Sequence, residues 1–145
     1  MGSTAIILKP STMARAALPV IALAVWTLLV WANRIRNIVA NDSLSGSTLF
    51  WRLTTAVLFV GAGLLLTVAL IWYVRTRHPF ALPVITWIGV SLAVIGTMFW
   101  VIRGTLIAFG EYDMGFKVIH SVLAVVSVVL GGIVVWWAGL IEDAT

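Results

Sequence analysis

The stretch VIHSVLAVVSVVLGGIVVWWAGL, residues 118–140, decides the fold of this chain. It contains no acidic or basic side chain apart from His120, which lies near its start. A helix needs roughly 20 apolar residues to cross the ~30 Å hydrocarbon core of a bilayer, and charged residues are rare within such spans. The stretch therefore predicts a transmembrane helix.

Three further apolar segments, at about 16–32, 50–74 and 82–102, have the same character. The chain has 145 residues, of which 62% are hydrophobic, and it contains only 9 Lys and Arg and 5 Asp and Glu. So few charged residues cannot cover four apolar helices with a soluble surface. We therefore predict an all-α membrane protein with four transmembrane helices in an antiparallel bundle, forming a single integral membrane domain over residues 1–145.

The expected helix limits follow from proline, the turn residues and tryptophan. Pro19 is expected in the first turn of the first helix, where its missing N–H is tolerated. The connection from Gly104 to Lys117 is expected to be a loop, and the second loop, which holds Pro79, is expected to be short. Tryptophan favours the membrane interfaces, which predicts Trp31, Trp51 and Trp100 at one face and Trp72, Trp87, Trp136 and Trp137 at the other.

The net charge of +4 comes from bases that are scattered at the ends of the apolar segments. Lys and Arg at such positions anchor helices to lipid headgroups, so the charge indicates lipids as partners and no nucleic acid. The absence of cysteine excludes disulfides, thiol catalysis and cysteine-ligated metals. No nucleophile with a base, paired carboxylates or phosphate-binding loop is present, so we expect no enzymatic activity, no cofactor and no metal.

Small residues form one stripe on each of the last two predicted helices. Spacings of three and four place residues on one helix face, and small residues on a face let a second membrane helix approach closely. The stripe of the third helix consists of Gly89, Ala93, Gly96, Trp100 and Arg103, and that of the fourth of His120, Ala124, Ser127, Gly131 and Ala138.

Both stripes lead to one candidate polar site near a single membrane face. Arg103 is expected at the end of the third helix and His120 about one turn into the fourth, both pointing inward. One interpretation is structural, with Arg103 reaching the headgroups and pairing with a loop carboxylate; the other is a quinone, lipid-headgroup or proton site. The neighbouring polar residues on that side are Glu111, Asp113 and Lys117 from the connecting loop, and Asn33, Arg34 and Asn37 from the first helix.

Haem is a third hypothesis, since haem anchors in membranes are often four-helix bundles with histidine ligands. His78 and His120 are expected at opposite faces of the bilayer, about 25 to 30 Å apart, and so cannot ligate one haem. Met98 is expected at a depth comparable with His120 and would be the remaining axial partner, although such a methionine more often serves packing.

Three segments carry a resemblance to small four-helix integral membrane proteins of actinobacteria. They are residues 31–37 (WANRIRN), 100–104 (WVIRG) and 115–124 (GFKVIHSVLA). The resemblance implies a location in the bacterial plasma membrane and, because such bacteria carry small additional subunits in their cytochrome bcc–aa3 respiratory supercomplexes, a respiratory partner. It brings no activity for particular residues.

The leading functional hypothesis is a non-catalytic accessory subunit of a larger membrane complex, with other integral membrane proteins as partners. A small oligomeric transporter or channel, with Arg103 and His120 along its path, and a haem- or menaquinone-binding anchor remain as alternatives. Arg75 and Arg77 occupy a short loop at the face of both termini, which favours cytoplasmic termini.

Overall fold

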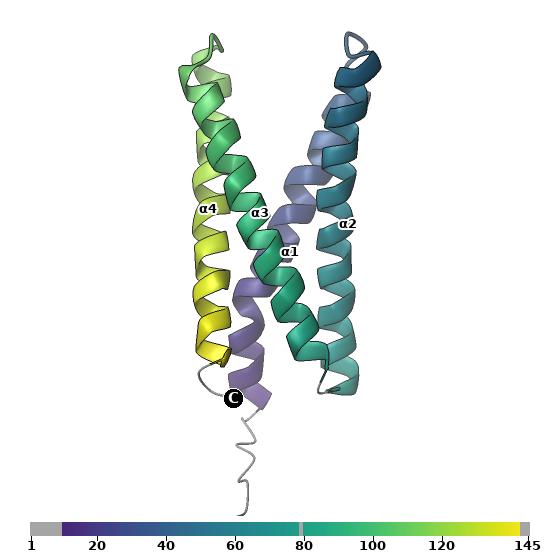
Figure 1. The fold of residues 1–145 in the computed structure, drawn as a ribbon, viewed down its shortest axis with the longest axis vertical. Coiled ribbons are helices and arrows are strands. Elements are labelled where there is room, and N and C mark those ends of the chain that lie inside the picture. The colour runs from purple at the N-terminus through teal and green to yellow at the C-terminus, as the bar shows by residue number, and fades with distance from the viewer. Residues whose placement is uncertain (1–9, 79, 143–145) are drawn as a thin grey trace, which may run out of the picture.

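The computed structural model describes residues 10–78 and 80–142, and the side chains of residues 17–78 and 80–141. Within these residues the chain forms four helices, α1 (Pro10–Val39), α2 (Gly46–Thr76), α3 (Ala81–Phe109) and α4 (Met114–Glu142). All four are long and apolar enough to cross a membrane. The predicted all-α bundle of four transmembrane helices is therefore confirmed, and Figure 1 shows that successive helices run in opposite directions.

The helices are longer than the hydrophobic segments that predicted them. α1 begins at Pro10, so the prediction that Pro19 lies in a first turn was wrong, and Pro19 is inside the helix. α3 continues to Phe109 and α4 begins at Met114, which leaves a connection much shorter than the predicted loop. A helix of 29 residues is about 44 Å long, whereas hydropathy marks only the ~30 Å inside the hydrocarbon.

Local hydrogen bonds define the start of α4 and the end of α2. Asp113 is the N-cap of α4, because its carboxylate accepts a hydrogen bond from the N–H of Phe116 at 2.9 Å. Arg77 ends α2 in the left-handed region at φ 53°, and its N–H donates to the carbonyl of Tyr73 at 2.9 Å. The short loop between α2 and α3 agrees with the prediction, although Pro79 itself lies outside the described residues.

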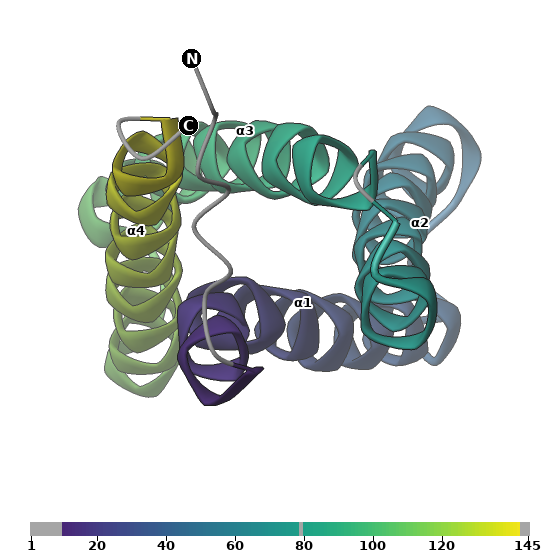
Figure 2. The ribbon, with the colours of Figure 1, turned by 90° about the horizontal axis from the view of Figure 1, so that it is seen from below.

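The four helices form a ring in which α1 and α3 slant between the outer helices α2 and α4 (Figures 1 and 2). At one end α1 lies beside α2 and α3 beside α4; at the other end α1 lies beside α4 and α3 beside α2. We call the end with the α1–α2 and α3–α4 loops the open end, because the two hairpins diverge there (Figure 1).

All four helices meet at Gly89 of α3. A Cβ atom at this glycine would lie 3.6 Å from Val20 of α1, 3.7 Å from Val134 of α4 and 4.0 Å from Leu66 of α2. Those three side chains are fully buried. Burial of apolar side chains at this crossing holds the two hairpins together, since close packing is the main attraction between helices in a bilayer.

The small-residue stripes are the contact surface of α3 and α4. Ala93, Gly131 and Ser127 are buried, and a Cβ at Gly131 would lie 3.1 Å from the carbonyl oxygen of Ala93. Ser127 also accepts a hydrogen bond from Trp26 of α1 at 2.9 Å. The sequence prediction that these stripes pack helix against helix is confirmed.

Three of the tryptophans expected at the membrane interfaces are core residues. Trp31 and Trp100 are only 2% and 4% exposed, and Trp137 is 7% exposed. Trp31 stacks on Phe59 with 4.2 Å between ring centroids, and Phe99 packs edge-on against both. These three tryptophans therefore pack against protein inside the bundle, and their placement at the membrane faces stays a prediction.

Candidate functional site

The predicted polar residues Arg103 and His120 line one cavity at the open end. The cavity has a volume of about 300 Å³, and α1 contributes Asn33, Arg34 and Asn37 to its walls. The structure therefore places the predicted polar residues of α1, α3 and α4 around one cavity. Their positions along the helices differ from expectation, because Arg103 precedes the end of α3 by six residues and His120 is the seventh residue of α4.

The predicted loop residues Glu111, Asp113 and Lys117 do not line this cavity. Asp113 caps α4, Glu111 is exposed, and Lys117 lies in the first turns of α4 and donates its N–H to the carbonyl of Asp113 at 3.1 Å. Among the described residues no carboxylate pairs with Arg103. The interpretation that Arg103 pairs with a loop carboxylate was therefore wrong. The loop is short, and Arg103 lies six residues before the end of α3, away from the loop.

His120 is oriented by its own helix. Its Nδ1 lies 2.9 Å from the carbonyl oxygen of Phe116, and its ring stacks on the Phe116 ring at 3.8 Å between centroids. A carbonyl oxygen only accepts hydrogen bonds, so Nδ1 carries a proton in this contact. In the neutral ring Nε2 then carries no proton, so it is the nitrogen that can contact a ligand or accept a proton.

Arg103 shares a second cavity with two further arginines. This cavity has a volume of about 190 Å³ and is lined by Arg34 of α1, Arg52 of α2 and Arg103 of α3, together with Trp51, Thr55 and Phe99. The charges of Arg103 and Arg52 both act on Arg34. The guanidinium of Arg34 also lies over the Trp31 ring, 5.8 Å from its centroid. We call Arg34, Arg52 and Arg103 the arginine cluster.

The arginine cluster has no internal counter-charge. Within the part of the chain that the structure describes, none of the three guanidiniums forms an ion pair, and the buried Nε of Arg103 has no hydrogen-bond partner. An unpaired buried polar group costs about 1–3 kcal/mol, and more when it is charged. The site is therefore electrostatically suited to an anion with several acceptor oxygens.

The sequence analysis did not include Arg52 in the candidate site, although this residue lines both cavities. The position of Arg52 along its helix could have placed it in the site. Arg34 lies five residues before the end of α1, Arg52 six residues after the start of α2, and Arg103 six residues before the end of α3. In an antiparallel bundle, residues at equal distances from the helix ends at one end of the bundle lie at the same height along the bundle axis. That comparison needs correct helix ends, which hydropathy did not supply.

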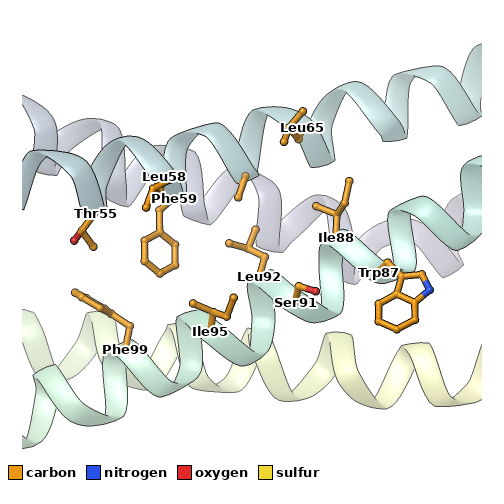
Figure 3. Close-up of a pocket in the computed structure, with 11 residues that line it drawn as sticks. Thr55, Leu58, Phe59, Leu65, Trp87, Ile88, Ser91, Leu92, Ile95 and Phe99 are labelled. Carbon is orange, nitrogen blue, oxygen red and sulfur yellow. The ribbon is translucent and has the colours of Figure 1, made fainter.

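An apolar groove lies between α2 and α3 (Figure 3). Its volume is about 680 Å³, and we call it the α2–α3 groove. Thr55 and Phe99 belong to the walls of both the groove and the arginine cavity, so the two lie next to each other. The remaining lining residues are Leu58, Phe59, Ala62, Leu65, Trp87, Ile88, Ser91, Leu92 and Ile95.

Among the residues that the structure describes, His78, Met98 and His120 are not placed together as ligands for a haem. His78 follows α2 at the end opposite His120, and Met98 is 60% exposed on the outside of α3. In the described part of the chain, no group of three or more His, Asp or Glu side chains is placed to hold a metal ion.

No protein-family model matches this chain, and no curated protein and no solved structure matches it. The fold and the geometry of the cavities therefore carry the functional argument.

Proposed function

We propose that this chain is a non-catalytic subunit of a larger integral membrane complex and that it binds its partner through the outer face of α4. The observation that carries this proposal is the placement of Gly132 and Gly139. A Cβ atom at either glycine would have no neighbour within 4 Å. Both residues are exposed on the outside of the bundle.

Glycine in a helix interior is unfavourable by about 0.5–1 kcal/mol relative to alanine. Gly131 offsets this by close packing on Ala93, whereas Gly132 and Gly139 make no such contact within the chain. Residues seven apart lie on the same side of a helix, and Val125, one heptad earlier, is 62% exposed on this side. Such a face accommodates a second transmembrane helix at short distance.

The resemblance to actinobacterial four-helix proteins suggests where to look for the partner complex. We propose the bacterial plasma membrane as the location and a cytochrome bcc–aa3 respiratory supercomplex as the first complex to examine. A partner helix on α4 would leave the open end and the arginine cluster free, because these lie between the hairpins.

The experiment is co-purification of a tagged full-length chain from its own membranes in a mild detergent, with mass spectrometry of the eluate. The test variant combines Gly132→Leu and Gly139→Leu, and Gly61→Leu on α2 is the matched control, because its Cβ also has no neighbour within 4 Å. The proposal predicts membrane proteins at fixed stoichiometry with the wild type and the control, and their loss with the double variant. Equal recovery from all three chains, or a homo-oligomer of this chain alone, contradicts it.

A further inference from the structure

We propose that the arginine cluster and the α2–α3 groove together bind one anionic phospholipid. Its phosphate lies among the three guanidiniums, and an acyl chain extends along the groove. This inference is independent of the partner proposed for α4, because it uses the opposite side of α3 and the space between the hairpins.

The chemistry of the headgroup end fits a phosphodiester. Arginine presents several N–H donors in a planar fork and binds phosphate with charge-assisted hydrogen bonds. Three such groups from three helices face one cavity, and Arg103 still has an unpaired buried Nε. A menaquinone head is neutral and would leave the three positive charges uncompensated, whereas a phosphate with a second anionic or polar group offsets them.

The depth of the cluster fits the level of lipid phosphates. Arg103 lies six residues before the end of α3, or about 9 Å along the axis at 1.5 Å per residue. A helix of 29 residues exceeds the ~30 Å hydrocarbon core by about 14 Å, or about 7 Å at each end. The cluster therefore lies at the boundary between hydrocarbon and headgroups.

The groove follows the direction of an acyl chain that starts at the arginine cluster. Along α3 it extends from Phe99 to Trp87, a rise of about 18 Å over twelve residue steps. On the scale given above it begins about 8 Å below the hydrocarbon boundary and continues past the bilayer midplane. Figure 3 shows its apolar walls on α2 and α3. The groove opens laterally to the bilayer, because Leu58, Leu65 and Ile95 on its rim are each at least 60% exposed.

The position of the two cavities side by side favours a lipid over other occupants. The walls shared through Thr55 and Phe99 place a charged compartment next to an apolar one. This arrangement matches an amphiphile with its charge at one end. A free anion would use only the arginine cavity, and an acidic helix of a partner protein would not require an adjoining apolar groove.

The test uses the delipidated full-length chain in detergent micelles with equal amounts of dioleoylphosphatidylglycerol and dioleoylphosphatidylcholine. Gel filtration followed by mass spectrometry gives the lipids retained per chain. Arg34→Gln with Arg103→Gln is the test variant, and Arg36→Gln with Arg75→Gln is the control, because it removes the same charge from exposed residues outside both cavities. Ser91→Phe fills the groove without changing the cluster.

We expect the wild type and the control to retain about one phosphatidylglycerol per chain in preference to phosphatidylcholine. Retention should fall at least about tenfold in the arginine variant, since a hydrogen bond to a charged group contributes about that factor or more, and it should fall in Ser91→Phe. Equal retention of both lipids, or unchanged retention in the arginine variant, overturns the proposal.

Two measurements on the wild type keep the inference testable if Ser91→Phe does not fold. Displacement of phosphatidylglycerol by inorganic phosphate at equal concentration would assign the cluster to a free anion and overturn the lipid site. A partner protein that co-purifies with the wild type and excludes phosphatidylglycerol from it would also overturn the site. Failure of the α4 variants to lose partners would leave this inference unaffected.

Discussion

Substitution of Gly131 by alanine should destabilise the bundle, whereas the same change at Gly132 should not. At Gly131 the new methyl group would lie 3.1 Å from the carbonyl oxygen of Ala93 and would also meet the hydroxyl of Thr97. Backbone atoms cannot rotate away, so α3 and α4 must separate slightly. At Gly132 the methyl group meets nothing within 4 Å.

The two variants share the gain from replacing glycine in a helix, about 0.5–1 kcal/mol. Their difference therefore isolates the overpacking term, which is about 1–3 kcal/mol in well-packed interiors. We expect Gly131→Ala to be less stable than Gly132→Ala by that amount and, because overpacking exceeds the helix gain over most of the range, less stable than the wild type.

The assay is reversible unfolding in mixed micelles with increasing mole fraction of dodecyl sulfate, followed by tryptophan fluorescence and far-ultraviolet circular dichroism. Free energies are compared at one detergent composition, so that all three chains share the same reference state. Equal free energies of unfolding for the two alanine variants would refute the close approach of α3 and α4, and with it the interpretation of the small-residue stripes.

Three further predictions test other contacts of the fold. The chain has no cysteine, so only introduced cysteines can react with a cross-linker. A short bismaleimide should join Arg34→Cys to Arg103→Cys in membranes, since both residues line the same two cavities. It should not join Arg36→Cys to Arg103→Cys, and the reverse result would refute the arginine cluster. Ser127→Ala should reduce the free energy of unfolding by about 0.6 kcal/mol, the typical strength of a hydrogen bond between membrane helices, because Trp26 loses its acceptor; a stability unchanged in the same micelle titration would exclude that bond. Asp113→Ala should reduce it by about 1 kcal/mol through loss of the α4 cap, and amide exchange at Phe116 that is no faster than in the wild type would contradict this role.

The four helices could be predicted because hydropathy reports directly on the hydrocarbon core. Their ends could not, because Arg103 and Gly104 resemble a helix end although α3 continues through Leu106 to Phe109, and because the added turns of α1 and α4 hold Arg36 and Lys117, residue types common to helix ends and loops. The burial of Trp31 and Trp100 could not be predicted either, because a tryptophan ring packs as well on aromatic side chains such as Phe59 and Phe99 as on lipid.

The candidate site was predictable to the extent that it follows from helix periodicity. The stripe that ends in Arg103 and the stripe that begins with His120 place both residues inward, and the structure brings them to one cavity. Arg52 and the α2–α3 groove were missed, because they depend on how α1 and α3 slant between the outer helices. Crossing angles are set by side-chain packing at contacts such as Gly89, which periodicity does not specify.

The mass of the intact particle released from native membranes in a mild detergent tests most directly the claim that this chain is a lipid-binding subunit of a larger complex. The account predicts a particle that contains the 15.7 kDa chain and larger membrane subunits at fixed stoichiometry. When the particle is dissociated at higher collision energy in the mass spectrometer, the chain should be released with one bound anionic phospholipid. A particle with the mass of the bare chain or of its homo-oligomer, free of phospholipid, would contradict the account.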